Sequence, residues 1–448
     1  MLEERLAAEE RHYLARTPGS ATRFRQAVDV LPGGDTRTGT YHAPYPTYMA
    51  RGAGTQLWDV DGNRYVDFLG NFTALIHGHA HPMVTAAIVE RAALGTAFPF
   101  PVDEQLHLAA LLQERLPSVQ RLRFCNSGTE AVLGAIRAAR AFTKRSRILK
   151  FEGGYHGSYD AAQVSVAPPL PAVPFPAGVP SGPGLSPGLV AEVLVAPFND
   201  TATAATIIHT HRTELAAVLL EPAMTAAGVI PPDPGFLDAV FGAAREAGVL
   251  VILDEIITFR LGLGGGQARF GVVPDLTTLG KIIGGGLPVG AFGGRADVMA
   301  TYDPRSPGAI AHSGTFNGNA LTMAAGLAAM RLLTPDAFAS LDALGERLRA
   351  GLRAACEDGG VPATVTGVGS LAHLHFCPGP VRNYRDSQRS DRLWTRCLHL
   401  GLLNRGFACA TRGMFALSTA STHAEVDALC EAVRDVVRVV RPVGAREA

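Results

Sequence analysis

The sequence predicts an α/β protein with a large domain built on a mainly parallel sheet and a smaller α+β domain at the C-terminal end. From about Val84, helical patterns alternate with short apolar runs, the order that produces βα units and parallel strands. A phosphate-type turn at Asn126–Glu130 and a lone lysine, Lys281, each follow a strand-like run. Parallel sheets hold ligands at strand ends, so we expect a site there.

Composition favours a chain with a large buried core. Of the 448 residues, 47% are hydrophobic and 18% are charged, which excludes a disordered chain. The 40 basic residues balance the 40 acidic ones, so no overall field attracts nucleic acid or an anionic membrane. Any chemistry that needs an amine has only three candidate lysines, which are Lys144, Lys150 and Lys281.

Cysteine usage and the N-terminal residues indicate a cytoplasmic protein. The six cysteines lack a C-x-x-C pattern and are expected to be free thiols of a reducing compartment. Residues 1–20 lack the apolar segment of a signal peptide, and no apolar run is long enough to cross a membrane.

The N-terminal part predicts a polar helix and a helical turn within residues 1–30, then a hairpin over Thr55–Phe68 with its turn at Asp61-Gly62. The predicted strands are Arg121–Cys125, Arg147–Phe151, Glu192–Val195, Ala216–Leu220, Val249–Leu253 and Val289–Gly293. The predicted helices between them are Ser127–Phe142, Thr201–His211 and Asp233–Ala247.

The proline- and glycine-rich residues 166–188 interrupt this alternation. They predict either an ordered surface loop over a site or a plain mobile insert. Further elements are expected at Ala320–Leu333, Ala337–Cys356, Leu371–Phe376, Phe415–Leu417 and His423–Val439. The predicted domains are an N-terminal segment packing with the small domain (1–75), a large domain (76–333) and a small C-terminal domain (334–448).

Two strand ends carry candidate ligand-binding residues. At Asn126–Glu130, Ser127 with Glu130 fits a capping box, and the backbone N–H groups of such a helix start also bind phosphate. Asp254 ends the most apolar strand, Val249–Leu253, where a buried carboxylate needs a cationic partner. An ordinary helix cap and a loop-capping aspartate are the respective alternatives.

Lys281 is the candidate nucleophile. It lies in the otherwise uncharged, glycine-rich run from Gly280 to Gly286. Amines in crowded apolar sites lose their protons more readily and form Schiff bases with carbonyl groups. A P-loop is excluded because Ile282 stands where that motif requires Ser or Thr.

The order of these features resembles that of the class III aminotransferases, pyridoxal 5′-phosphate (PLP) enzymes of fold type I, the aspartate aminotransferase-like fold. The chain is similar to the branch around glutamate-1-semialdehyde aminomutase, and within it to β-amino-acid aminotransferases of the β-phenylalanine type. The segments that carry the resemblance are Asn126–Ala131, Phe151–Gly157, Glu221-Pro222, Asp254-Glu255, Pro274–Gly286 and Gly314–Asn319.

The resemblance implies a role for each matching residue. Lys281 would hold PLP as a Schiff base and move the substrate proton, while Asp254 would bind the pyridine nitrogen. Tyr155 would stack on one face of the ring and Ile256 would pack on the other. The phosphate-binding residues would be Ser127, Gly128 and Thr129.

Three more positions match the family near the cofactor. His156 and Glu221 would lie beside it, and Thr315 would reach the phosphate of the neighbouring subunit in a homodimer. The histidine-rich segment from His77 to His81 resembles a metal cluster, but this segment is a structural turn in the family, so no metal is expected.

Residues of the substrate pocket separate the reactions of this branch. Arg412 stands where the aminomutases carry Glu, and Phe72 stands where they carry Trp. In the β-amino-acid group, Arg37 would bind the substrate carboxylate and the mobile Arg412 would bind the α-keto acid. Phe72 and Met224 indicate an apolar pocket. A surface ion pair is the alternative for either arginine.

The expected activity is ping-pong transfer of an amino group from a β-amino acid, including aromatic ones, to pyruvate or 2-oxoglutarate. The partners would be small molecules and a second copy of the chain, without nucleic acid or membrane. Three alternatives stay open: glutamate-1-semialdehyde 2,1-aminomutase, amination of a carrier-bound β-keto acyl chain, and a non-catalytic PLP-fold binding protein.

Overall fold

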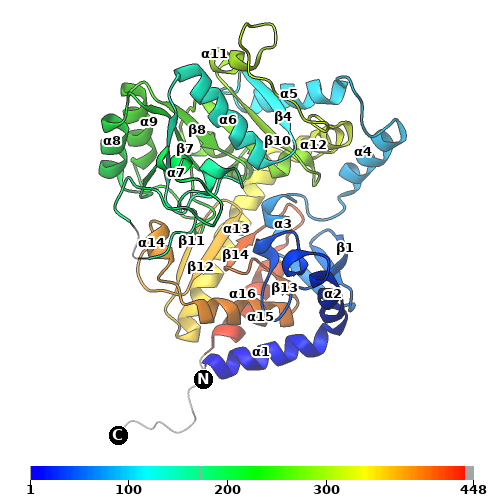
Figure 1. The fold of residues 1–448 in the computed structure, drawn as a ribbon. Coiled ribbons are helices and arrows are strands. Elements are labelled where there is room, and N and C mark those ends of the chain that lie inside the picture. The colour runs from blue at the N-terminus through cyan, green and yellow to red at the C-terminus, as the bar shows by residue number, and fades with distance from the viewer. Residues whose placement is uncertain (1, 171–172, 439–448) are drawn as a thin grey trace. The chain divides into compact units, whose positions relative to one another are not determined.

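The computed structural model describes residues 2–170 and 173–438, which form two compact units (Figure 1). One unit contains the chain up to Phe72, Leu341–Pro380 and the chain from Arg389 on. The other contains Thr73–Ser340 and Val381–Gln388. The predicted C-terminal domain, 334–448, therefore differs from this division, because Val381–Gln388 cluster with the large unit.

A seven-stranded sheet forms the centre of the large unit. Its order is β4 (Arg121–Cys125), β10 (Gly290–Gly294), β9 (Leu276–Gly280), β8 (Leu250–Asp254), β7 (Leu215–Leu220), β5 (Arg147–Phe151) and β6 (Val193–Ala196). The strands from β9 to β6 are parallel, and β10 pairs antiparallel with both neighbours. The mainly parallel sheet is confirmed, and each predicted strand is found within one residue of its expected bounds. β9, expected only as a strand-like run, is a full strand.

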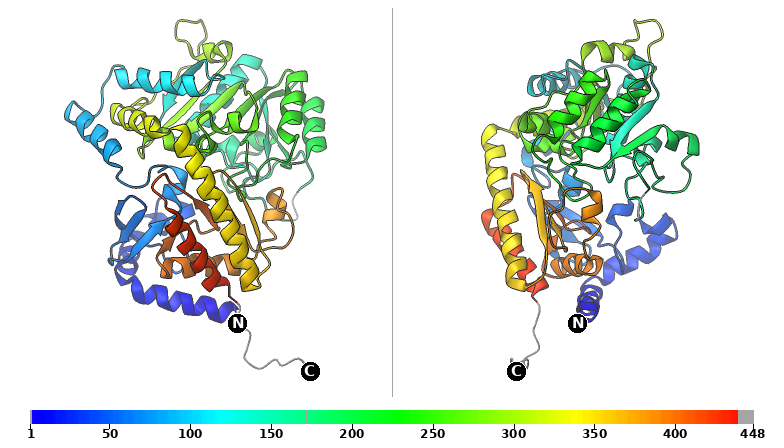
Figure 2. Two further views of the ribbon diagram at one scale, coloured as in Figure 1. Left: turned by 180° about the vertical axis from the view of Figure 1, so that it is seen from behind. Right: turned by 90° about the vertical axis from the view of Figure 1, so that its left-hand side faces the viewer.

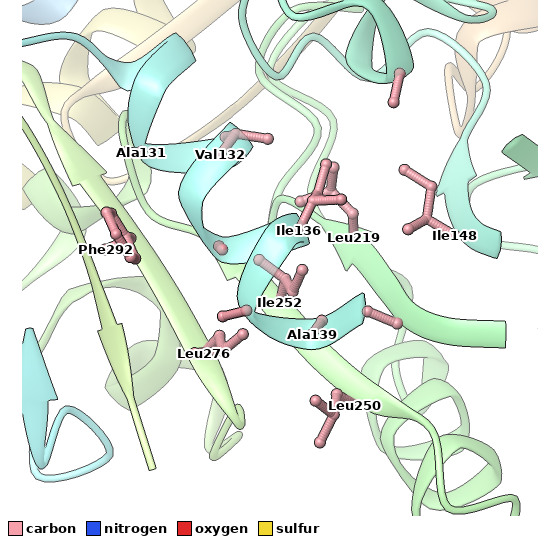
Figure 3. Packing of buried hydrophobic residues seen from close by; sticks show 14 of the residues in the cluster. Ala131, Val132, Ile136, Ala139, Ile148, Leu219, Leu250, Ile252, Leu276 and Phe292 are labelled. Carbon is pink, nitrogen blue, oxygen red and sulfur yellow. The ribbon is translucent and has the colours of Figure 1, made fainter. Parts of the chain in front are cut away.

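The helix α6 (Gly128–Thr143) packs across this sheet (Figure 3). Its side chains Ala131, Val132, Ile136 and Ala139 meet alternate strand residues, and Ile252 among these has no exposed surface. Complete burial of such an aliphatic side chain contributes about 1.5–3 kcal/mol. This packing fixes the start of α6 relative to the strand ends.

Further helices surround the sheet (Figure 2). α12 packs against α4 and α5, and α8 packs against α9. Their bounds, with those of the shorter helices, are α4 (Pro82–Ala93), α5 (Asp103–Arg115), α7 (Pro187–Ala191), α8 (Thr201–Thr210), α9 (Phe236–Glu246), α10 (Gly265–Phe270), α11 (Ala296–Met299), α12 (Ala320–Leu332) and α14 (Tyr384–Ser387). The single-turn 3-10 helices of this unit are η3 (Asp160–Gln163), η4 (Thr258–Leu261), η5 (Lys281–Gly284) and η6 (Ala300–Tyr302).

The described part of the loop 166–188 is fastened to the large unit. Ser165 donates its backbone N–H to Val179 O, and Val195 donates to Pro176 O at 3.0 Å. The Tyr384 hydroxyl donates to Pro168 O at 2.9 Å. These bonds favour the ordered loop over the mobile insert, while its position over a site stays a prediction.

The smaller unit contains two sheets. One has the order β1 (Met49–Ala53), β2 (Gln56–Asp59), β3 (Arg64–Asp67) and β13 (Phe407–Ala408), and the other has the antiparallel order β11 (Thr364–Val368), β12 (Leu371–His375) and β14 (Met414–Ala416). The predicted hairpin corresponds to β2 and β3.

Five longer helices lie wholly or mainly in this unit: α1 (Leu2–Arg16), α2 (Pro18–Val28), α13 (Pro335–Gly359), α15 (Arg392–Asn404) and α16 (His423–Val437). The start of α13, up to Ser340, belongs to the large unit. Two 3-10 turns, η1 (Pro32–Gly34) and η2 (Thr38–Thr40), follow α2. The helical turn predicted after the first helix is wrong, because α2 is an 11-residue helix that Pro18 begins. The predicted end of α16 at Val439 lies outside the described residues.

All six cysteines are buried and free, as predicted. Among the described residues, no helix has the length and apolar character needed to cross a bilayer. Within the same ranges, no group of three or more His, Cys, Asp or Glu side chains could hold a metal ion. His77 instead makes a hydrogen bond from its ring to Ala329 O at 2.9 Å.

The partly buried His42 and the buried His399 form a pair in the smaller unit. The rings of His42 and His399 meet edge to face, with centroids 4.6 Å apart. Both ring nitrogens of His399 are buried without a partner among the described residues. Burial lowers the pKa of His42 to about 4 and holds the pKa of His399 well below its ordinary value. Both rings are therefore neutral in the folded protein.

We predict that acid destabilises this unit through the two histidines. Their unfolded pKa is about 6.5, so their stabilising contribution is complete above that pH and is lost as the pH falls toward the folded values. For His42 the loss is about 2 kcal/mol by pH 5. His399→Leu should reduce the decrease in Tm between pH 7 and pH 5, measured by calorimetry. His209→Leu, at an exposed histidine, is the control. Equal pH dependence in both variants would contradict this account.

Candidate active site

The parallel strands bring three charged residues to one edge of the sheet. Glu221 follows β7, Asp254 is the last residue of β8, and Lys281 follows β9, and these three strands are neighbours. The carboxyl ends of neighbouring parallel strands meet at the same edge. The site predicted at the strand ends therefore collects acidic groups and one amine.

Asp254 is buried among hydrogen-bond donors. One carboxylate oxygen, Oδ1, accepts the N–H of Ile256 and the hydroxyl of Thr278, both at 3.1 Å. The other, Oδ2, lies 2.7 Å from Nδ1 of His156. Burial lowers the pKa of His156 below its ordinary value, so a neutral ring with its proton on Nδ1 donates to Asp254. A carboxylate has about four acceptor positions, which leaves one for a further donor.

Glu221 and Lys281 interact electrostatically with Asp254. Burial, followed by the Asp254 charge, raises the pKa of Glu221 to about 8. Thr225 donates its backbone N–H and its hydroxyl to the Glu221 carboxylate. Burial lowers the pKa of Lys281, while Asp254 and Glu221 oppose that shift. Its amine is thereby more readily available as a nucleophile.

The start of α6 packs against the segment that follows Asp254. A Cβ added to Gly128 would lie 2.7 Å from Cδ1 of Ile256, so a side chain there would displace the end of Ile256. Ser127 caps the helix by accepting the N–H of Glu130 at 3.2 Å. The predicted capping box is incomplete, because the Glu130 carboxylate accepts the N–H of Asn126 and not that of Ser127.

The residues after β5 complete this edge of the sheet. Gly157 has a φ of +91°, and a Cβ there would lie 2.6 Å from the Thr129 hydroxyl, which also accepts the N–H of Ser158 at 3.0 Å. Tyr155 is exposed, whereas the adjacent His156 is buried. Thr129, Ile256 and His156 are thus gathered around the ends of β4, β5 and β8.

Thr315 lies in an exposed turn that contacts the start of α6. The Asn126 amide donates to the Asn317 side chain at 2.8 Å. Thr315 and its neighbour Phe316 project into solvent, with Phe316 57% exposed.

The substrate candidates lie apart from this cluster in the sequence. In the smaller unit, Nη1 of Arg37 donates to Asn71 Oδ1 at 2.7 Å, and its guanidinium lies over the ring of Phe72. Arg412 lies exposed in the turn Ala410–Gly413 of the same unit, where its charge acts on His373. Met224 is a buried residue of the large unit, paired with Ile230 after β7.

The chain belongs to the class III aminotransferases, because the sequence profile of that family matches residues 39–437. Across 433 residues it is 41% identical to the β-phenylalanine transaminase of Variovorax paradoxus, covering 96% of this chain and 95% of that protein. It is equally similar, at 41% over 416 residues, to the glutamate-1-semialdehyde 2,1-aminomutase of Sorangium cellulosum, covering 92% and 94%.

Solved structures give the same result. An ω-transaminase from Sphaerobacter thermophilus superposes with a TM-score of 0.90 at 46% identity, covering 95% of this chain and 98% of that one. A transaminase solved with PLP bound superposes with a TM-score of 0.88 at 35% identity, covering 94% and 97%. The predicted fold type I is confirmed, and the protein is a PLP-dependent aminotransferase.

The residues at the strand ends fit PLP. The glycine at the start of α6 leaves backbone N–H groups open to a phosphate, and the hydroxyls of Ser127 and Thr129 lie beside them. The remaining acceptor position of Asp254 suits a protonated ring nitrogen. Lys281 supplies a buried amine whose pKa is lowered. These roles remain predictions for the individual residues.

One supporting residue, Thr278, was missed in the sequence, and His156 and Lys150 make contacts that the sequence did not indicate. Thr278 and His156 both bind Asp254, and only the alternation within β9 could have indicated that Thr278 shares its face. Lys150, one of the three candidate amines, has a structural role with specific partners. Its buried amine donates to the carbonyl oxygens of Gly154 (2.9 Å), Ala162 (3.0 Å) and Val164. Lys150 thus holds the loop that carries Tyr155.

We predict that Lys150→Met weakens cofactor retention as well as stability. Burial lowers the pKa of Lys150 to about 7, yet three carbonyl acceptors match the three N–H donors of an ammonium group. Each carbonyl left without a donor costs about 1–3 kcal/mol. Tm should fall by several degrees, and dialysis should remove PLP faster.

Lys144→Met is the matched control, because Lys144 is exposed at the end of α6. It makes the same substitution six residues earlier in the chain. If the two variants retained PLP equally well, Lys150 would have no role in holding the loop.

Proposed function

We propose that this aminotransferase moves the amino group of a β-amino acid, including aromatic ones, to an α-keto acid such as pyruvate or 2-oxoglutarate. The observation that carries the proposal is the environment of Arg37. Its guanidinium is exposed and is bound by the neutral amide of Asn71. A cation held in this way keeps its charge for a carboxylate. The relative named for β-phenylalanine supports the same substrate class.

The site residues have distinct tasks in this proposal. Bound PLP supplies an electron sink for the carbon that carries the amine. Asp254, fixed by Thr278, Ile256 and His156, keeps the ring nitrogen of the cofactor charged. The Lys281 amine holds the cofactor and carries the proton to and from the substrate. Arg37 binds the carboxylate of the β-amino acid, and Arg412 binds that of the keto acid.

A second candidate is glutamate-1-semialdehyde 2,1-aminomutase, because such relatives are as similar to this chain. That isomerase moves an amino group within one molecule and needs no external keto acid. The replacement of its acidic residue by Arg412 favours the transaminase.

A donor panel tests the proposal. The purified protein should convert β-amino acids in preference to α- and ω-amino donors, with one keto acid released for each acceptor aminated, measured by chromatography. Lys281→Ala should abolish turnover and the yellow colour of the bound cofactor. Conversion of glutamate-1-semialdehyde without an acceptor would favour the isomerase, and turnover in Lys281→Ala would refute the assigned lysine.

We also propose that the active form is a homodimer. Large apolar side chains stand exposed on the large unit, among them Phe100 (79% exposed), Leu106 (68%) and Phe316 (57%), which is next to Thr315. A hollow of about 640 Å³ is lined by Leu106 with other residues of α5, β4 and the 312–317 segment. A patch of this kind on a family member suits a second copy of the chain. The six free cysteines support a cytoplasmic location.

Phe316→Asp is expected to weaken that dimer, because it places a charge within the apolar patch. Light scattering should give a dimer for the wild type and a monomer fraction that grows on dilution for the variant. Val273→Asp, at a 77% exposed position after α10, is the control and should stay dimeric. A monomeric wild type that is fully active would contradict the proposal.

A further inference from the structure

A left-handed turn lies directly beside Arg37. The labelled element α3 (Gly70–Thr73) has four consecutive positive φ angles: 55° at Gly70, 50° at Asn71, 53° at Phe72 and 75° at Thr73. Each non-glycine residue in this conformation costs roughly 1–2 kcal/mol, and the cost is highest for bulky side chains. Such strain persists only where the surrounding structure enforces it, and it concentrates at functional sites.

The end of this turn is clamped by a buried cation. Nη1 of Arg260, a side chain only 2% exposed, donates to the carbonyl oxygen of Thr73 at 3.2 Å. Burial lowers the pKa of Arg260 to about 10. Arg260 lies in η4, six residues after Asp254, so the clamp comes from the segment that follows the cofactor-binding strand. The strained backbone is therefore held by Arg260, a residue from outside the turn.

The turn presents two side chains to Arg37. Asn71 Oδ1 accepts the N–H of Nη1 at 2.7 Å, and the Phe72 ring lies 5.7 Å below the guanidinium carbon. The Phe72 ring also meets the backbone of Gly39, at 3.5 Å from the position of an added Cβ. One hydrogen bond and one ring face together fix the orientation of the guanidinium plane.

The neighbouring acid, Asp35, makes hydrogen bonds within its own turn. The carboxylate of Asp35 accepts the Thr36 N–H at 2.6 Å and the Thr40 hydroxyl. Burial raises the pKa of Asp35, but the bonds from Thr40 and Thr36, and then the Arg37 charge, lower it overall. Both oxygens of Asp35 are thus engaged within their own turn. The guanidinium of Arg37 keeps four further N–H donors for a ligand.

We propose that Asn71 is a positioning residue that selects substrates with a carboxylate, by holding Arg37 through an uncharged amide on the strained turn. This inference rests on the proposed function of Arg37. An acid at position 71 would pair with Arg37 and compete with the substrate. An apolar residue would release the guanidinium and would also be strained at φ 50°.

Two substitutions separate these effects. Asn71→Gly removes the amide and fits the left-handed backbone without strain, so the holoenzyme should fold normally. Its KM for a β-amino acid should rise roughly tenfold, the loss of one charge-assisted hydrogen bond, with kcat changed less than about threefold. Asn71→Asp should raise KM further, because the new carboxylate occupies Arg37. The dissociation constant of 3-phenylpropanoate, a carboxylate without an amine, should rise in parallel in both variants.

Asn199→Gly is the matched control. Asn199 also has a positive φ, 63°, but binds Pro231 O and Arg382 O far from Arg37 in the sequence. Its KM and 3-phenylpropanoate affinity should stay within about twofold of the wild type. Arg37→Ala should show a KM at least as high as that of Asn71→Gly.

The outcomes distinguish the inference from the function on which it rests. A wild type that transaminates β-amino acids, with both Asn71 variants within twofold of it in KM, overturns the inference alone. An equal loss of kcat and Tm in Asn71→Gly, with unchanged 3-phenylpropanoate affinity, shows a purely structural role and also overturns it. A wild type inactive on β-amino acids overturns the function and the inference together.

Discussion

The central constraint of this structure is a buried carboxylate at the end of a buried strand. Every residue of β8 is buried, and Asp254 at its end would be very unfavourable without donors. The fold meets this requirement from three directions, with a hydroxyl on β9, a backbone N–H two residues on, and an imidazole after β5. The position of Asp254 in turn shapes the charge of its neighbours, since its charge adds to burial in raising the pKa of Glu221 and opposes the lowering of the pKa of Lys281 by burial.

The close packing at this edge of the sheet explains two glycines beside it. Gly128 allows the start of α6 to lie against Ile256, and Gly157 allows the next loop to lie against Thr129. A side chain at Gly157 would clash with the backbone of Thr129, and one at Gly128 would displace the end of Ile256. The N–H groups, hydroxyls, carboxylate and amine that this packing gathers are the groups that we propose to hold the cofactor.

Arg37, the proposed substrate residue, follows a different physical rule. At the strand ends, Asp254 is buried and hydrogen-bonded, whereas Arg37 is exposed and held by a neutral amide and a ring face. Burial and hydrogen bonding hold a charged side chain in one position. Exposure without neutralisation leaves a cation ready for a transient ligand. In the strained turn Gly70–Thr73, Asn71 and Phe72 contact Arg37, and the carbonyl oxygen of Thr73 accepts a hydrogen bond from the buried Arg260.

The sequence by itself determined the alternation of strands and helices, the residues at the strand ends and the family, because these depend on local periodicity and short motifs. Lys281, Asp254 and Ser127 could be selected from the printed residues alone. The partners of Asp254, the carbonyl cage of Lys150, the full length of α2 and the assignment of Val381–Gln388 to the large unit were decided only by tertiary structure. So was the left-handed turn at Asn71, because a backbone held against its own preference is stabilised by contacts from residues far away in the chain, and no local pattern records them.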